Sequence, residues 1–301
     1  MMAWVEAVEG TARGHDIALV LALSAAFLHA IFGALQKGRH DPWISRMAMD
    51  WSYGLMAAPF ALFVVPWPAA GMWPIFAVVV VVHIGYKLVQ AACYSRGAFT
   101  VVYPVLRGVA PLFTVIGAYV LFGERFTALQ WLGVGVLLAG IFGLALYNLV
   151  FLTTARDTLP LALVLAVITG LFVALYTTID AYGIRATPDP ATFLAWFFFL
   201  DGIFFATGVA LVRRAEIAGM AGKGALAARG VLGGAVAIAS FGAIMLATRL
   251  DKVGEAAVLR ETSTVFAALI GWVMLGERVG PRRLALMAAI ASGAVIVEFG
   301  G

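Results

Sequence analysis

Residues 73–95 carry a polar stripe along one face of a predicted helix. The stripe consists of His83, Tyr86, Lys87, Gln90 and Tyr94, and spacings of three and four residues bring side chains to the same side of an α-helix. An ammonium group and an imidazole in this position could bind an anionic ligand or exchange a proton near neutral pH. The stripe therefore favours the lining of a polar cavity. The alternative is a structural network that holds this helix against its neighbours.

The next predicted helix, residues 100–122, offers a second set of polar groups. Tyr103, Arg107 and Pro111 recur every four residues and share roughly one face. Pro104 and Pro111 each remove a backbone donor and bend a helix, which leaves carbonyl groups free to meet a ligand or water. We predict that Tyr103 stacks on a bound molecule and that Arg107 lies at a gate. The alternative is a kinked packing helix in which Arg107 pairs with an acid.

Further charged residues fall within apolar segments. Arg46 and Asp50 are four residues apart and are predicted to pair with each other along one helix. A charge at the centre of a bilayer costs roughly 3 kcal/mol or more, so Asp201 needs a partner, which the sequence does not identify. Tyr176 and Asp180 share one helix face and are additional candidates for the cavity lining.

These groups must be positioned by helices that cross a lipid bilayer. The chain has 301 residues, of which 63% are hydrophobic and 12% charged, whereas a soluble domain carries roughly 25% charged residues. Crossing the apolar core takes about 20 residues in a helix, and the apolar runs do not alternate as barrel strands would. We therefore predict an all-α, polytopic membrane protein with ten helices, at residues 17–36, 43–65, 73–95, 100–122, 127–147, 159–182, 191–212, 230–248, 255–275 and 281–299.

An internal repeat organises these ten helices into two halves. Leu106-Arg107 recurs as Leu259-Arg260, and Gly123-Glu124-Arg125 recurs as Gly276-Glu277-Arg278, both at an offset of 153 residues. We predict halves at 1–150 and 151–301. Five crossings per half is an odd number, so the second half enters the bilayer from the opposite side. Inverted repeats of this kind are common in transporters and place a cavity between the halves near the middle of the membrane.

The two halves differ at the positions that matter for a ligand. Ser240 occupies the place of Lys87, and we include Ser240 in the predicted binding site because an asymmetric ligand needs an asymmetric site. Arg260 is the equivalent of Arg107 and is followed by Glu261 near a predicted helix start, where a solvated or interfacial pair is an alternative. The second half lacks the Tyr103-Pro104 pair, so the helix at 255–275 need not kink as the helix at 100–122 does.

The sequence resembles the EamA-type drug/metabolite transporter superfamily. The resemblance rests on the segments 94–98 and 103–111 and on Gly123-Glu124-Arg125 with its repeat, and it covers nearly the whole chain. It implies ten helices, a central cavity and the export of small metabolites. Among its members, we favour the bacterial aromatic amino-acid exporters as the expected subgroup, because tyrosines could receive a ring and His83 and Lys87 a carboxylate. The expected substrate-binding residues are His83, Tyr86, Lys87, Gln90, Tyr103, Arg107, Tyr176 and Ser240.

Two other functions compete with metabolite export. One is transport of a different small solute, and the other is an integral-membrane, lipid-modifying enzyme. The enzyme needs clustered catalytic groups, but the four histidines, at positions 15, 29, 40 and 83, have no metal-ligand spacing, and no nucleophile–base motif or P-loop is present. We therefore predict no catalytic residue, no metal and no cofactor.

The expected setting is the inner (plasma) membrane, with a small-molecule substrate, the lipid bilayer as the surroundings, no nucleic-acid partner and a monomeric state. An even number of helices puts both termini on the same side. More Lys and Arg residues lie on the side opposite the termini, which by the positive-inside rule puts the termini outside. Members of the resembled family usually keep both termini in the cytoplasm, so the sequence leaves the orientation open.

Overall fold

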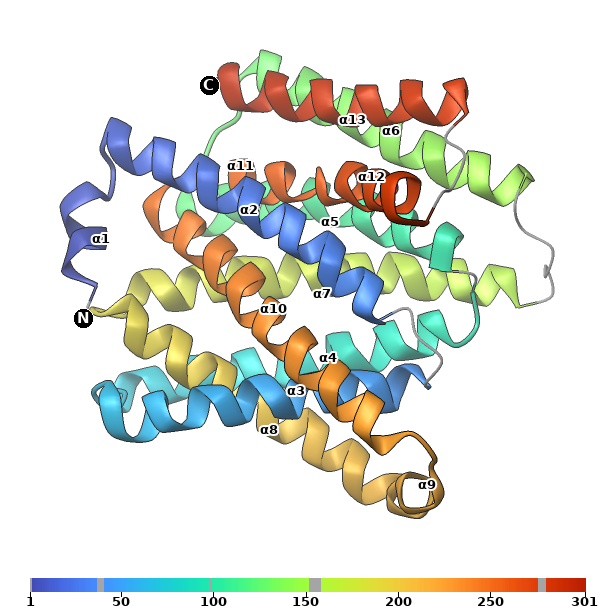
Figure 1. Ribbon diagram of the computed structural model, residues 1–301. Helices are drawn as coiled ribbons and strands as arrows, with labels where there is room; N and C mark the ends of the chain where they lie inside the picture. Colours follow the sequence, from blue (N-terminus) through green and yellow to red (C-terminus); the bar gives the residue numbers. More distant parts are fainter. Residues whose placement is uncertain (1, 37–40, 98, 152–157, 276–279) are drawn as a thin grey trace.

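The computed structural model describes residues 2–36, 41–97, 99–151, 158–275 and 280–301. These residues form helices and short connections, and no strand is found among them (Figure 1). The helices are α1 (Ala3–Val8), α2 (Ala12–Gln36), α3 (Pro42–Pro59), α4 (Trp73–Tyr94), α5 (Phe99–Phe122), α6 (Ala128–Phe151), α7 (Leu159–Ala186), α8 (Pro190–Val212), α9 (Arg214–Gly219), α10 (Lys223–Leu250), α11 (Val253–Arg260), α12 (Ser263–Leu275) and α13 (Pro281–Phe299).

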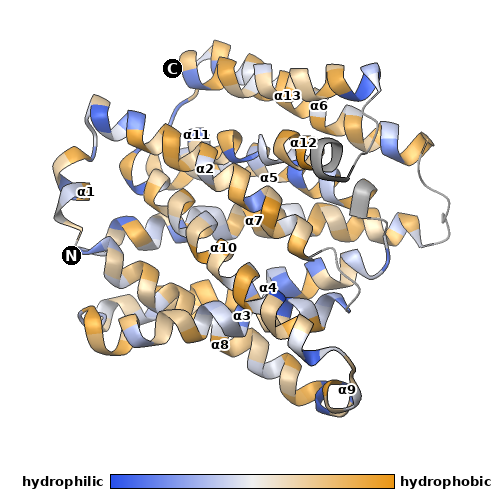
Figure 2. Ribbon diagram, in the orientation of Figure 1, coloured by the Kyte–Doolittle hydropathy of each residue, from blue (hydrophilic) through white to orange (hydrophobic). Residues whose placement is uncertain are grey.

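Eight of these helices, α2 to α8 and α10, are long and apolar enough to cross a membrane. Hydrophobic residues predominate along the long helices (Figure 2). The predicted all-helical membrane fold is confirmed to this extent. The structure adds the short helices α1 and α9, and α10 begins at Lys223 instead of residue 230. The second Gly-Glu-Arg motif, at 276–278, lies outside the described residues.

Local sequence sets the start of two membrane helices. Asp41 precedes Pro42 at the start of α3, and its carboxylate accepts the backbone N–H groups of Trp43 at 2.8 Å and Ile44 at 3.3 Å. Asp189 precedes Pro190 in the same way and accepts the N–H of Ala191. An aspartate cap followed by proline satisfies or removes the donors that have no partner within the helix.

The helix predicted at 255–275 as one segment is broken, although it lacks the Tyr-Pro pair of its counterpart. It ends as α11 at Arg260 and resumes as α12 at Ser263. The hydroxyl of Thr262 donates to the Leu259 carbonyl at 2.7 Å, and that of Thr264 donates to the Glu261 carbonyl at 2.8 Å. Side-chain hydroxyls that take up backbone carbonyls compete with regular helix bonding. By contrast, α5 is continuous despite its two prolines.

The first long helix of each half packs against helices of the other half. The first helix of the first half, α2, packs against α10 and α12, and its repeat equivalent α7 packs against α4 and α5. Two equivalent pairs, α3 with α8 and α6 with α13, pack against each other and lie at opposite sides of the bundle (Figure 1). This pattern approximates two-fold symmetry, and it brings residues from both halves to the centre of the bundle.

Glycine residues allow both equivalent pairs to approach closely. A Cβ atom added to Gly202 on α8 would lie 2.6 Å from the Asp50 carbonyl oxygen and 2.6 Å from Cα of Gly54 on α3. A Cβ added to Gly293 on α13 would lie 2.5 Å from the Leu137 backbone nitrogen on α6. Small residues at helix contacts permit this backbone approach in membranes. The α3–α8 contact also brings the aspartates of these two helices near each other.

We expect Gly202→Ala to destabilise the protein by about 1–3 kcal/mol, because the added methyl group meets backbone atoms that must move apart. Gly208 lies on the same helix and has open space around its Cα, so Gly208→Ala is the matched control and should leave stability unchanged or slightly higher. Thermal unfolding in detergent measures both. Equal melting temperatures for the two variants would contradict the close α3–α8 contact.

Candidate functional site

Lys87 on α4 is held between two aspartates from the repeat-equivalent helices α3 and α8. Its Nζ lies 2.8 Å from Asp50 Oδ2 and 2.8 Å from Asp201 Oδ1, and it donates to the Asp201 carbonyl and the Tyr53 hydroxyl at 3.0 Å. The lysine side chain is fully buried. The Asp201 carboxylate, the Asp201 carbonyl and the Tyr53 hydroxyl accept the three hydrogen bonds of the ammonium group, and Asp50 adds an ion-pair contact. Lys87 is therefore the partner of Asp201 that the sequence did not identify.

The same cluster continues through Arg46 toward α4. Arg46 Nε lies 2.7 Å from Asp50 Oδ1, which confirms the predicted pairing of these two residues. Arg46 also approaches Gln90, whose amide donates to the Tyr86 hydroxyl at 2.5 Å. We call Arg46, Asp50, Lys87 and Asp201 the lysine cluster.

His83 links the lysine cluster to α7. Its Nε2 lies 3.0 Å from Asp180 Oδ2, and its Nδ1 lies 3.5 Å from Asp201 Oδ1. The imidazole also packs against the ring of Tyr176, with centroids 4.7 Å apart. Each nitrogen of this buried ring thus faces a different carboxylate.

Two arginines from equivalent positions have different partners. Arg107 Nε lies 2.7 Å from Glu261 Oε2, and another guanidinium nitrogen donates to the Ser263 hydroxyl at 2.9 Å. Arg260 is 2% exposed and donates to the Thr177 hydroxyl at 3.2 Å, but its Nε has no hydrogen-bond partner. Among the described residues, no carboxylate lies within ion-pair distance of Arg260. Glu261 thus pairs with Arg107, whereas Arg260 interacts with Asp180 and Glu261 only at longer range.

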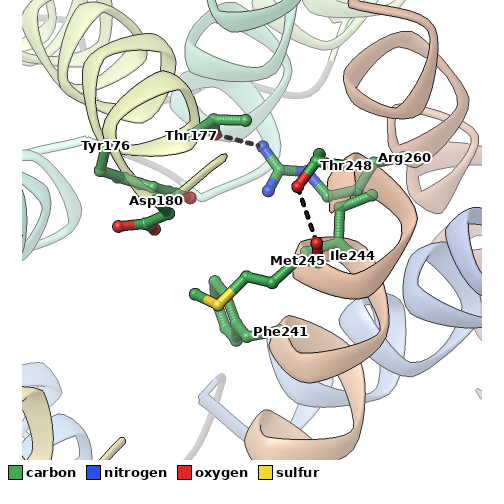
Figure 3. Close-up of a pocket in the computed structure, with 8 residues that line it drawn as sticks. All are labelled: Tyr176, Thr177, Asp180, Phe241, Ile244, Met245, Thr248 and Arg260. Atoms are coloured by element: carbon green, nitrogen blue, oxygen red, sulfur yellow. Dashed lines mark hydrogen bonds between the residues drawn. The ribbon is translucent and has the colours of Figure 1, made fainter. Parts of the chain in front are cut away.

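Arg260 faces a small cavity between α7, α10 and α11, which we call the arginine cavity. Asp180 and Tyr176 lie across it from Arg260, with Phe241 and Met245 at its edge (Figure 3). Its free space is about 10 Å³, room for about one water molecule. A buried cation and a buried carboxylate on opposite walls of one cavity match a ligand that carries both an anionic and a cationic group. Its full lining is Tyr176, Thr177, Asp180, Phe241, Ile244, Met245, Thr248 and Arg260.

A second cavity, which we call the tyrosine cavity, lies beside the first and shares Tyr176 with it. Its free space is also about 10 Å³. Neither cavity has room for a metabolite, so the ligand-sized space expected beside these residues is not found in the part of the chain that the structure describes. The lining residues are His29, Phe32, Gly33, Tyr86, Gln90, Tyr94, Tyr103, Leu106, Arg107, Val173 and Tyr176.

The eight residues predicted to bind substrate fall into two groups. Five of them line the tyrosine cavity: Tyr86, Gln90, Tyr103, Arg107 and Tyr176. His83, Lys87 and Ser240 line neither cavity. Ser240 is buried, and its hydroxyl donates to the Ala25 carbonyl at 2.9 Å. The contacts of Lys87 are those of the structural network that stood as the alternative for the stripe.

Sequence reasoning did not assign Arg260 to the site, and it missed Thr177, Thr248 and Phe241. The repeat did mark Arg260 as the twin of Arg107. Its position near a predicted helix start indicated the membrane interface, however, whereas the break between α11 and α12 places it in the interior. Thr177 and Thr248 gave no signal, because a threonine within a membrane helix more often bonds to its own backbone.

A larger hollow, of about 530 Å³, lies between α2, α3, α8 and α10. The side chains that line it are apolar, among them Phe60, Leu194, Phe198 and Leu246. It offers no charged group to orient a polar ligand, so it is not the candidate site. A specific site needs a few well-placed polar groups in addition to apolar walls.

The helix ends beside the arginine cavity are joined by a second polar network. Glu124, from the first Gly-Glu-Arg motif, accepts the backbone N–H groups of Val253 at 2.9 Å and Gly254 at 3.0 Å, in the first turn of α11. Arg185 pairs with Glu124 at 3.4 Å and donates to the Asp251 carbonyl. Both termini lie at this end of the bundle (Figure 1). The network ties the end of α5 to α7, α10 and α11 and closes the bundle there.

We expect Glu124→Ala to lower stability by about 1–3 kcal/mol, because two helix N–H groups and Arg185 lose a buried acceptor. Glu216→Ala is the control: it removes an exposed ion pair with Arg213, and such pairs contribute about 0–1 kcal/mol. Thermal unfolding in detergent compares the two variants. A loss in the control as large as that in Glu124→Ala would contradict this role of the motif.

Comparison with known proteins adds two findings. The family model described as the EamA-like transporter family matches residues 16–146 and 160–299, one match in each half. A solved crystal structure of another protein is similar to this chain, with a TM-score of 0.73 and 18% sequence identity, over 94% of this chain and 99% of that chain. The likeness to that structure concerns the fold. No curated protein sequence matches the chain.

Proposed function

Because the chain belongs to the EamA-like transporter family, we propose that it is a secondary transporter that exports amino acids, aromatic ones in preference. Membership of the family supports a membrane transporter for small molecules. The substrate class rests on one observation: Arg260, buried and without an acidic partner among the described residues, lies across a cavity from Asp180. We infer that the guanidinium receives the substrate carboxylate and that Asp180 receives its ammonium group.

The side chains between these two charges support an aromatic preference. Tyr176, Phe241 and Met245 line the arginine cavity, and Tyr86 packs on Tyr176 with ring centroids 4.9 Å apart. Aromatic pairs favour such tilted and edge-on contacts, and methionine adapts to irregular apolar partners. An amino acid with an aromatic ring would place the ring toward these residues and the tyrosine cavity, which contains the predicted binding residues Tyr103 and Arg107.

The closed cavities support alternating access. With room for about one water molecule in each, an amino acid can enter only if helices of the two halves move apart. We propose that the halves, residues 1–150 and 151–301, are inverted repeats with ten crossings in total, in which α11 and α12 together form the ninth and α13 the tenth. The break at Glu261-Thr262 gives the ninth crossing a point at which it can bend. We further propose that the protein acts as a monomer in the inner membrane.

A substrate panel in reconstituted liposomes tests the proposal. Vesicles loaded with unlabelled amino acid should accumulate labelled phenylalanine by exchange, faster than they accumulate labelled glucose or labelled phosphate. Protein-free vesicles give the background. Exchange of none of the amino acids, with a different solute transported instead, would contradict the substrate class. The release of a product from a lipid substrate would favour the enzyme alternative.

A further inference from the structure

A histidine and two acids from distant parts of the chain meet at the end of the bundle that carries both termini (Figure 1). His15 lies in the first turn of α2, Asp251 directly follows α10, and Glu255 lies in the first turn of α11. His15 Nδ1 contacts Asp251 Oδ2, and one ligand atom from each of the three residues lies within 4.8 Å of the other two. An imidazole nitrogen and carboxylate oxygens at this spacing match the ligands of a divalent transition-metal ion such as Zn²⁺.

Glu298 on α13 gives an independent indication of a ligand at this place. The residue is 8% exposed, and its Oε1 accepts no hydrogen bond from any residue that the structure describes. This oxygen lies 3.3 Å from His15 Nε2. A histidine that binds a metal through one ring nitrogen donates its other N–H, often to a carboxylate. A metal ion on Nδ1 would fix the proton on Nε2, and His15 would then supply the donor that Glu298 lacks.

The two acidic ligands are held by neighbouring groups as well. Asp251 Oδ1 accepts the backbone N–H of Lys252 at 2.8 Å, while Oδ2 of the same carboxylate meets His15. Glu255 Oε1 accepts the side-chain amide of Gln130 at 2.5 Å, and Gln130 is fully buried. Partners of this kind orient the ligands of metal sites. Each of the three ligands therefore has a positioning partner outside the set.

The cluster carries more negative than positive charge. Asp251, Glu255 and Glu298 bring three carboxylates, and one ammonium group, that of Lys252, lies among them, 2.6 Å from Glu255 Oε1. With a neutral His15 the surplus is two negative charges, which one divalent cation neutralises. With a protonated ring one negative charge still remains. The adjacent acids at this end of the bundle are already balanced, in the pairs Glu9–Arg249 and Glu124–Arg185.

We propose that His15, Asp251 and Glu255 form a binding site for Zn²⁺ or a related transition-metal ion, that Glu298 orients the histidine, and that the bound ion holds α2, α11 and α13 together. Water completes the four-coordinate shell. Lys252 competes with the ion for Glu255, and because its side chain is 38% exposed it can turn toward water when the ion binds. No spacing in the sequence marks the site, because His15 and Asp251 are 236 residues apart.

Isothermal titration calorimetry of the full chain, without a histidine tag and after treatment with EDTA, tests the site without transport. Titration with ZnCl₂ at pH 7 should show one site per chain, and MgCl₂ should give no binding. His15→Gln should weaken Zn²⁺ binding by more than about 100-fold, since loss of a positioning partner alone, as in Glu298→Gln, costs about 10- to 100-fold. Lys252→Met should strengthen binding severalfold, because the competing cation is gone.

Glu9→Gln is the matched control, because Glu9 lies at the same end of the bundle and pairs with Arg249; its affinity should equal that of the wild type. A wild type that binds no Zn²⁺ in a one-to-one ratio would overturn the proposal, and so would equal affinities of the wild type and His15→Gln. If His15→Gln does not fold, the wild type, Glu298→Gln and Lys252→Met decide.

Thermal unfolding in detergent measures whether the ion holds the helices together. A ligand that binds the folded state stabilises it, so saturating ZnCl₂ should raise the melting temperature of the wild type and Glu9→Gln by a few degrees. The melting temperature of His15→Gln should not change. An unchanged melting temperature of the wild type at saturating Zn²⁺ would contradict a site that joins three helices.

The metal site also has a consequence for transport, which rests on the proposed function. Glu255 and Arg260 lie on the same short helix, α11, so an ion on Glu255 restrains the helix that carries the proposed carboxylate site. Zn²⁺ should therefore slow amino-acid exchange in liposomes containing the wild type and leave His15→Gln unaffected. Exchange by the wild type that ignores saturating Zn²⁺ would refute this restraint, whereas the absence of exchange without Zn²⁺ would refute the proposed function and leave the binding results standing.

Discussion

Replacing Arg260 with methionine is expected to lower amino-acid exchange in liposomes strongly while leaving the folded protein at least as stable as the wild type. The guanidinium is buried, and no acid pairs with it among the described residues. Its removal breaks no ion pair, because Glu261 stays paired with Arg107 and Asp180 with His83. A charged hydrogen bond to the substrate carboxylate contributes about 1.5–3 kcal/mol, so affinity should fall roughly 10- to 100-fold. Exchange assays and thermal unfolding measure the two effects separately.

Arg107→Met is the matched comparison, because Arg107 occupies the equivalent position in the first half. Its loss strands Glu261, which lies 2.7 Å from the guanidinium and is 1% exposed. Breaking a buried pair in this way costs about 3–5 kcal/mol. The two variants should therefore differ: Arg107→Met should lower the stability of the protein, and Arg260→Met should lower its transport activity. Normal exchange by Arg260→Met would remove the proposed carboxylate site.

The second large effect is expected at Lys87. Lys87→Met leaves Arg46 paired with Asp50 and removes the ammonium partner of Asp201, and we expect a loss of about 3–5 kcal/mol in stability. The additional change Asp201→Asn removes the surplus negative charge and should recover part of that loss. Lys223→Met is the control, because Lys223 is exposed and donates to a backbone carbonyl.

Thermal unfolding in detergent distinguishes the two roles considered for Lys87. A variant that unfolds early and is rescued by Asp201→Asn identifies Lys87 as the centre of a structural cluster. If Lys87→Met retained wild-type stability and yet bound phenylalanine poorly, the lysine would be a ligand-binding residue, and the cluster assignment would fail.

Local chemistry made much of the fold predictable. The apolar runs gave the membrane helices because a helix of that length and composition is stable in lipid. The Arg46–Asp50 pair could be foreseen because residues four apart on a helix are neighbours. The internal repeat also marked Arg260, because Leu106-Arg107 recurs as Leu259-Arg260 at the equivalent place in the second half.

Contacts between helices that are distant in the sequence could not be predicted in this way. Asp50 and Asp201 both reach Lys87 because glycines let α3 and α8 approach, and no local pattern encodes that approach. The stripe on α4 does share a face, but α4 packs against both α7 and α8. The stripe therefore divides, so that His83 and Lys87 bind acids while Tyr86 and Gln90 line a cavity. The break after Arg260 occurs where two threonine hydroxyls bond to nearby carbonyls, in a segment whose composition favours a continuous helix.

The most direct test of the zwitterion site is a thermal-shift comparison of three ligands with the same ring: phenylalanine, phenethylamine and 3-phenylpropionate. If Arg260 and Asp180 bind the two charged ends of one molecule, only phenylalanine should raise the melting temperature of the wild type, and this shift should vanish in Arg260→Met. Stabilisation of the same size by phenethylamine or by 3-phenylpropionate would show that one of the two charges is not recognised and would contradict the site.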